Sequence, residues 1–163
     1  ESIYKRIIDS NRLQDFEDFL NKVDLNYKLV ASTDAQGQPA VAIKFPNQIV
    51  EFNQLASSGM LALALFYYWF INIAEVRLLV IDEFDAFYHS KLSEKFVKLL
   101  IESDCQVILT THNTSVMTNE LMRPDCYFRI NGNGITSLAN ATDIEIREAH
   151  NLEKIYRSGW FDE

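Results

Sequence analysis

The chain has 163 residues, the length of about one domain, and its 48% hydrophobic and 23% charged residues exclude a disordered or low-complexity chain. Acidic residues outnumber basic ones by 23 to 15, for a net charge of −8. This balance makes the chain a poor stand-alone binder of nucleic acid or anionic membrane, because phosphate recognition needs clustered Lys and Arg. Cys105 and Cys126 show no CxxC pattern, which argues against a disulfide framework or a zinc site and predicts a reducing, cytoplasmic location.

The N-terminal third of the sequence changes character near residue 28. Residues 3–25 carry apolar side chains at three- and four-residue spacings, which predicts one or two amphipathic helices covering a core. Residues 28–53 alternate short β-prone runs with the turn sequence at 34–39, which predicts a small antiparallel sheet.

The middle of the chain predicts a parallel βαβ unit. The apolar stretch 60–74 is shorter than the roughly 20 residues of a membrane span, so we expect a fully buried core helix. The run 76–81 is typical of a strand buried on both faces. An amphipathic helix at 91–103 and a second apolar strand at 106–109 complete the unit.

The last 37 residues are expected to form a hairpin and a helix. Apolar and β-prone residues flank the turn sequence Gly132-Asn133-Gly134, so residues 127–138 predict a β-hairpin. Residues 143–157 carry many charges and predict a C-terminal helix.

Polar residues follow both strands of the βαβ unit. Asp82 and Glu83 end the first strand. His112 follows the second strand, 30 residues after Asp82. Active sites of open α/β sheets lie at the carboxyl edge, so we expect these side chains to be close. One carboxylate could hold Mg²⁺ through water, the other could orient a water for attack on phosphorus, and the imidazole could contact a phosphate oxygen. Two solvated acids and a structural histidine are the alternative.

A third motif, Ser57-Ser58-Gly59, opens the apolar helix. The free N–H groups and the dipole of a helix N-terminus favour phosphate, and a glycine allows close backbone approach. A plain serine cap is the alternative interpretation.

The order of these motifs resembles the C-terminal half of an ABC-type ATPase domain over roughly residues 40–160, and most closely the SMC-like and overcoming-lysogenization-defect-like heads. In that resemblance residues 56–60 stand at the signature sequence and residues 78–83 match Walker B. Residues 84–89, with Tyr88 and His89, cover the D-loop, and His112 falls on the switch histidine within Thr110-Thr111-His112-Asn113.

The resemblance implies an α/β, P-loop NTPase-like fold: the C-terminal part of a parallel sheet with flanking helices and a small antiparallel piece. It divides the chain into a helical segment, 1–27, and a part with signature, Walker B and switch histidine, 28–163. It implies ATP and Mg²⁺ as cofactors, with Asp82 holding the metal through water and Glu83 and His112 as catalytic residues. Ser57, Ser58 and Gly59 would contact the nucleotide of a second head in an ATP-dependent homodimer.

The chain departs from the family pattern in two places. Ala56 and Met60 replace the Leu and Gln of the signature. None of the five glycines precedes Lys-Ser or Lys-Thr, so the sequence has no Walker A P-loop. We therefore expect this chain to be the C-terminal portion of a longer ATPase, inactive without its Walker A lobe, with nucleic acid contacted only indirectly in the full protein.

Two other functions stay open at this point. Asp82, Glu83, Asp85 and His112 could form the metal site of a nuclease. A degenerate head that dimerises without hydrolysis is the second alternative.

Overall fold

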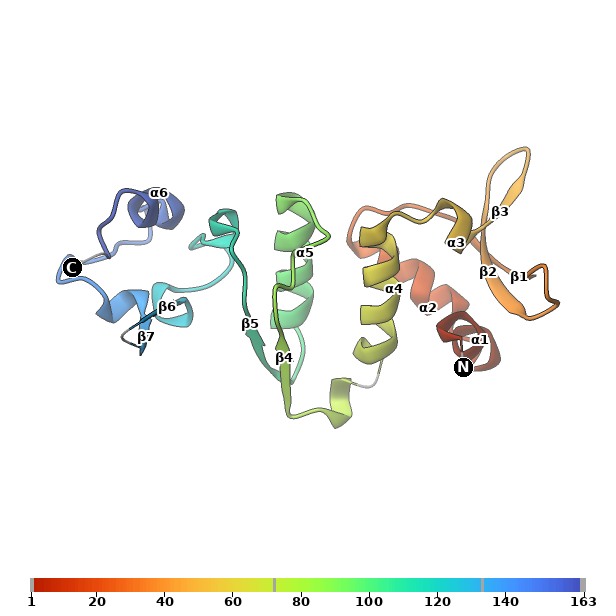
Figure 1. The fold of residues 1–163 in the computed structure, drawn as a ribbon, viewed down its shortest axis with the longest axis horizontal. Coiled ribbons are helices and arrows are strands. Elements are labelled where there is room, and N and C mark those ends of the chain that lie inside the picture. The colour runs from red at the N-terminus through yellow and green to blue at the C-terminus, as the bar shows by residue number, and fades with distance from the viewer. Residues whose placement is uncertain (1, 72, 133, 162–163) are drawn as a thin grey trace.

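The computed structural model describes residues 2–71, 73–132 and 134–161. Figure 1 shows the elements spread along one long axis. The N-terminal helices and antiparallel sheet lie at one end, the parallel strands with their crossover helix lie in the middle, and the C-terminal hairpin and helix lie at the other end.

The N-terminal region confirms the two elements expected from the sequence. Two helices, α1 (Ile3–Asp9) and α2 (Leu13–Lys22), precede an antiparallel sheet of order β1-β2-β3. Its strands are β1 (Leu29–Thr33), β2 (Pro39–Lys44) and β3 (Ile49–Glu51). The turn after β1 closes because the Asp34 carboxylate accepts hydrogen bonds from the backbone N–H groups of Gln36 and Gln38, at 2.9 and 2.8 Å.

A short helix, α3 (Phe52–Leu55), leads into the apolar helix α4 (Ser58–Phe70). One face of α4 is buried against the core, but Leu61, Leu65 and Trp69 repeat every fourth residue and are 40%, 50% and 58% exposed. The prediction of a fully buried helix was therefore wrong for this face, which the described residues leave uncovered. Among the described residues, no helix has the length and apolar character needed to cross a bilayer.

The middle of the chain confirms the βαβ unit. Strands β4 (Leu78–Ile81) and β5 (Gln106–Leu109) pair in parallel, and the helix α5 (Ser90–Ile101) forms the crossover between them. The side chains of Leu79, Ile81, Val107 and Leu109 pack on the core.

The opposite face of this sheet corrects the expectation that β4 is buried on both sides. Leu78, Val80 and Ile108 are 50%, 58% and 46% exposed. The apolar run predicts burial of both faces because parallel sheets are normally covered on both sides. In the described part of the chain this sheet has two strands, and only the face of Leu79 and Ile81 packs against the core.

The main hydrophobic core joins the N-terminal helices to the βαβ unit. Aromatic rings make up much of it: Phe66 of α4 contacts Phe96 of α5 with ring centroids 4.2 Å apart, and Phe84 stacks on Phe96 at 5.9 Å. The largest fully buried side chains of this cluster are Phe16, Phe52, Phe96, Ile7, Leu20, Ile43, Leu63 and Val41. The loop after β4 is thus anchored in the same core as the helices.

The C-terminal region has its own small core of Tyr127, Leu138, Leu152 and Phe161. The predicted hairpin is present as β6 (Phe128–Asn131) and β7 (Gly134–Ser137), paired antiparallel, and Asn133 of its turn sequence lies outside the described residues. Short 3₁₀ helices complete the described structure at Ile73–Glu75, Thr114–Val116, Pro124–Cys126 and Leu138–Asn140.

The helix predicted for residues 143–157 is shorter than expected: α6 covers only Leu152–Arg157. The Asn151 side chain caps it by accepting a hydrogen bond from the Lys154 N–H at 2.8 Å. Before the cap, the side-chain amide of Asn119 donates to the carbonyls of Glu148 and His150, at 2.9 and 3.0 Å. These bonds hold the preceding segment as a loop, and a count of charged residues could not have shown them.

Candidate functional site

The polar residues that follow β4 and β5 lie side by side, as the sequence predicted. Ile81 and Leu109 are partners in the parallel register, so Asp82 and Thr110 leave the sheet at the same edge. The backbone extends the pairing beyond the strands: Thr110 N donates to the Ile81 carbonyl at 3.0 Å, and Phe84 N donates to the Thr110 carbonyl at 3.1 Å. The two strand ends are therefore fixed to each other before any side chain is considered.

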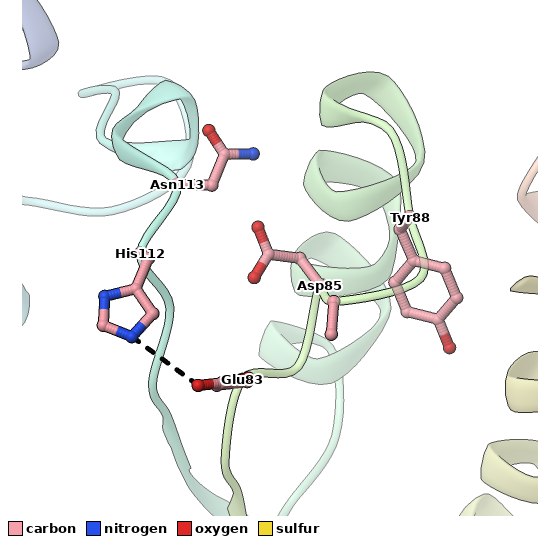
Figure 2. Close-up of a pocket in the computed structure, with 6 residues that line it drawn as sticks. Glu83, Asp85, Tyr88, His112 and Asn113 are labelled. Carbon is pink, nitrogen blue, oxygen red and sulfur yellow. Dashed lines mark ion pairs between the residues drawn. The ribbon is translucent and has the colours of Figure 1, made fainter.

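Glu83 and His112 meet across this edge. The Nε2 atom of His112 lies 3.6 Å from Oε1 of Glu83, and Figure 2 shows the imidazole directed at the carboxylate from the opposite strand end. Both side chains are open to solvent, at 93% and 60% exposed. Glu83 has a φ of +45°, in the left-handed region that non-glycine residues rarely occupy. An imidazole and a carboxylate so placed can share a proton or a water with a bound ligand.

Two threonines cross-link the strand ends, a role that the sequence analysis did not assign. The Thr110 hydroxyl accepts a hydrogen bond from the Glu83 N–H at 2.8 Å and donates one to Oδ1 of Asp82. The Thr111 hydroxyl donates to Oδ1 of Asp85 at 2.6 Å. The sequence signal for this role is the pair of hydroxyl residues directly before His112, because a run of acidic residues follows the neighbouring strand.

The loop after β4 separates two hollows on the surface. The first, of about 330 Å³, is lined by Glu83, Asp85, Ala86, Tyr88, His112 and Asn113. Figure 2 shows Asp85 and Asn113 facing each other across it, while the Tyr88 ring points away from His112. Tyr88 instead packs on Phe96, with ring centroids 5.5 Å apart, and burial raises its pKa to about 12. Tyr88 is therefore a neutral phenol at physiological pH.

The predicted D-loop residue His89 has a structural contact of its own. It precedes α5, and its Nδ1 accepts a hydrogen bond from the Leu92 N–H at 3.4 Å, so the imidazole caps this helix. The side chain also lines the second hollow, together with Phe87.

The Ser57–Gly59 segment forms the tip of α4, as predicted. The Ser57 hydroxyl caps the helix by accepting from Met60 N at 3.3 Å, and Ser57 and Ser58 are exposed. Gly59 is buried, and a Cβ there would lie 2.8 Å from the Phe87 carbonyl oxygen. The close approach that this glycine permits is therefore to the chain's own loop.

The helix tip and the Glu83–His112 pair do not share a hollow. Ser57 and Gly59 line the second one, with apolar residues of the 25–27 segment, β2–β3 and α5 around them. Within a single chain the helix tip, which the resemblance assigns to the nucleotide of a second head, thus lies on the other side of the 82–89 loop from the chain's own Glu83–His112 pair.

The residues present fit part of a nucleotide site. Carboxylates such as Asp82 are ligands that Mg²⁺ accepts while it keeps several waters. The sequence contains no P-loop, so a backbone cradle for the β- and γ-phosphates is not supplied by these residues. No group of three or more His, Cys, Asp or Glu suited to a metal occurs among the described residues, which leaves the nuclease alternative without a preformed cluster.

The first comparison with known proteins concerns sequence families. The family described as "AAA domain, putative AbiEii toxin, Type IV TA system" matches residues 4–118. This match covers β4, β5 and both strand-end motifs. A search of curated proteins finds no match.

Solved structures similar to the chain are SMC ATPase heads. One, described as "Structural biochemistry of ATP-driven dimerization and DNA stimulated activation of SMC ATPases", has a TM-score of 0.56 at 16% identity over 79% of this chain and 85% of that one. Smc head domains from Pyrococcus furiosus and Pyrococcus yayanosii each have a TM-score of 0.48 over 64% of this chain, at 18% and 19% identity. The chain spans only 29% and 22% of those two chains.

These findings confirm the recognised family and the α/β, P-loop NTPase-like fold class, and they support a nucleotide-binding, ATPase-type function. The chain belongs to the AAA-domain family whose description includes the AbiEii-type toxins, and its fold is similar to that of the SMC ATPases.

Proposed function

We propose that this chain supplies the signature, Walker B, D-loop and switch-histidine parts of an ATP-hydrolysing, ABC-type head. The observation that carries the proposal is the 3.6 Å approach of His112 to Glu83 at the carboxyl edge of a parallel strand pair. Asp82, the residue directly before Glu83, lies at the same edge. Catalysis of phosphoryl transfer depends mainly on positioning and charge stabilisation, and this edge provides fixed groups for both.

Each residue of the edge has a distinct proposed role. Asp82 would hold Mg²⁺ through a water, because Mg²⁺ keeps several of its waters in proteins, and the metal would neutralise phosphate charge. Glu83 accepts a hydrogen bond from the attacking water and orients it. His112 donates a hydrogen bond to the γ-phosphate, which brings its imidazole within reach of both the phosphate and Glu83.

A P-loop from a Walker A lobe outside this sequence completes the proposed site. The exposed apolar face of β4 and β5 supports this part, because Leu78, Val80 and Ile108 would be covered by further structure packed on the sheet. The division of this chain into 1–27 and 28–163 stays a prediction.

A second copy of the head supplies the other half of the proposed site. Ser57 and Ser58 are exposed at the tip of α4, and the 82–89 loop separates them from their own Glu83–His112 pair. A head-to-tail homodimer would bring the tip of one copy to the γ-phosphate held by the other, with Gly59 keeping the helix tip close to the D-loop residues Tyr88 and His89. ATP would then hold the dimer together and hydrolysis would release it.

The net charge of −8 favours only indirect contact with nucleic acid in the full protein. We keep the prediction of a reducing, cytoplasmic location, with which the two free cysteines agree.

The proposal is tested by ATP hydrolysis in the complete protein with Mg²⁺, comparing wild type with Glu83→Gln. We expect the variant to lose at least about 100-fold in turnover, as removal of a general base does, while ATP-dependent dimers persist in sedimentation. Glu120→Gln changes an exposed glutamate outside both hollows and should keep wild-type turnover.

Three results would contradict parts of this account. Wild-type turnover in Glu83→Gln would remove Glu83 from its role. ATP-dependent dimers without any hydrolysis by the wild type would favour the degenerate dimerisation module. Metal-dependent cleavage of nucleic acid without ATP would favour the nuclease.

A further inference from the structure

We propose that Thr110 is a positioning residue for ATP hydrolysis, because its hydroxyl fixes the metal-side carboxylate of Asp82 and the backbone of Glu83 at the same time. This inference rests on the function proposed above and deepens it. Its basis is the pair of hydrogen bonds that the Thr110 Oγ1 atom makes to two consecutive residues at the end of the neighbouring strand.

The chemistry of the partners fixes the direction of both bonds. A backbone N–H can only donate, so the hydroxyl oxygen accepts from Glu83 N, at 2.8 Å. An ionised carboxylate can only accept, so the single hydroxyl proton of Thr110 goes to Oδ1 of Asp82. With Oδ1 engaged, the other carboxylate oxygen of the exposed Asp82 side chain could accept a hydrogen bond from a metal-bound water.

The conformation of Glu83 explains why its N–H needs a fixed partner. The φ of +45° places the residue in a sparsely populated region, which costs energy and persists only when surrounding contacts hold it. The Thr110 hydroxyl holds the N–H side of Glu83, and the Thr110 carbonyl holds the N–H of Phe84 on the other side. The Glu83 side chain thereby leaves the backbone in the direction that reaches His112.

A second hydroxyl repeats the arrangement one residue later. Thr111 Oγ1 donates to Asp85 at 2.6 Å and accepts from the Asn113 N–H at 2.9 Å. This bond pair joins the residue after His112 to the loop after Glu83. We assign Thr111 a weaker positioning role, because it contacts neither Asp82 nor Glu83.

The variant Thr110→Val replaces the hydroxyl with a methyl group and so tests the role of the hydroxyl alone. Valine keeps the β-branched shape and the backbone bonds to Ile81 and Phe84, so β4 and β5 stay paired. It leaves the Glu83 N–H without its acceptor and Asp82 without its donor. Thr110→Ser restores the hydroxyl with a smaller side chain.

The experiment measures kcat and KM for ATP in the complete protein, with wild type, Thr110→Val, Thr110→Ser and Thr111→Val. We expect Thr110→Val to lose about 10- to 100-fold in kcat with KM changed less than about threefold, because misplacement of a reacting group acts on the chemical step. Thr110→Ser should recover most of kcat, and Thr111→Val should lose less than Thr110→Val. Thr136→Val, an exposed threonine on β7 outside both hollows, is the matched control.

A second measurement reports on the bonds without turnover. Amide hydrogen exchange at Glu83 should be faster in Thr110→Val than in wild type or Thr110→Ser. Unchanged exchange at Glu83, or wild-type kcat in Thr110→Val, would overturn this inference alone, provided that the wild type hydrolyses ATP. A wild type without ATP turnover would overturn the proposed function, and this inference with it.

Discussion

The two hollows on either side of the 82–89 loop are built in different ways. The first, around Glu83 and His112, is held by hydrogen bonds between exposed strand ends, through Thr110 and Thr111. The second, around the α4 tip, is lined largely by apolar side chains that touch the main core. Directional bonds set the angles that chemistry requires, whereas apolar walls suit contact with another surface. This difference is what the proposed catalytic edge on one side and the proposed dimer contact on the other would require.

The largest effect is expected at the first hollow. His112→Ala removes the imidazole that faces Glu83 and should lower ATP turnover of the complete protein by about 100-fold, as loss of a positioned acid or base group does. Phosphate release measures the effect. His150→Ala is the matched change, since His150 contacts Trp160 in the C-terminal region and lines neither hollow. Equal turnover in the two variants would show that His112 has no special part in the reaction.

A change at the second hollow tests how the α4 tip meets the loop. Gly59→Ala would place a Cβ 2.8 Å from the Phe87 carbonyl, a backbone atom that cannot move without shifting the loop. We expect the chain to lose about 2 kcal/mol in its free energy of unfolding, measured in urea. Gly132→Ala meets nothing within 4 Å and should change stability by less than about 0.5 kcal/mol. A tolerated Gly59→Ala would mean that the tip and the loop are not in firm contact.

A buried glutamate of α2 binds the start of β1, which follows two wall residues of the second hollow in sequence. Glu17 accepts hydrogen bonds from Lys28 Nζ at 2.8 Å and Leu29 N at 2.7 Å, next to the wall residues Leu25 and Tyr27. Burial alone would raise the pKa of Glu17, but these bonds favour the charged form and the net pKa is lowered. Glu17→Gln should cost about 1 kcal/mol near pH 7 in urea unfolding.

The contribution of Glu17 to stability depends on pH. Because the folded state lowers its pKa, the stabilisation is present above the ordinary value of 4.5 and is lost as the pH falls through the folded-state value. The stability difference between wild type and Glu17→Gln should therefore shrink below pH 4.5. A difference that grows on acidification would contradict the assigned bonds.

The smallest effect is expected on the open face of the parallel strands. Val80→Thr changes a side chain that is 58% exposed and should alter the unfolding free energy of this chain by less than about 0.5 kcal/mol. Val107→Thr makes the same change on the packed face and should cost about 1 kcal/mol or more, since it brings a hydroxyl against the core. Equal losses would show that the open face is covered within this chain.

Local patterns predicted much of the fold. Spacing of apolar residues located the N-terminal helices, and the order strand–helix–strand placed Asp82, Glu83 and His112 at one edge. Features that depend on distant partners were missed. The exposed face at Leu78 and Val80 depends on which elements cover the sheet, and apolar composition cannot show this.

The sequence predicted the residue types of the candidate site but not the hydrogen bonds that position them. The acids and the histidine stand out as motifs, whereas the bonds of Thr110 join residues 28 positions apart and depend on strand register. The left-handed backbone of Glu83 likewise follows from the turn after β4 rather than from a glycine in the sequence. The late start of the predicted C-terminal helix has the same origin, in the bonds of Asn119.

The central claim is that Glu83 of one copy and Ser57 of another serve the same ATP. Its most direct test mixes two variants of the complete protein, Glu83→Gln and Ser57→Arg, each inactive alone. In a head-to-tail dimer the mixed pair keeps one intact site, so a 1:1 mixture should recover roughly a quarter of wild-type ATP turnover. No recovery, with mixed dimers demonstrated by differential tagging, would place both residues at separate sites and contradict the account.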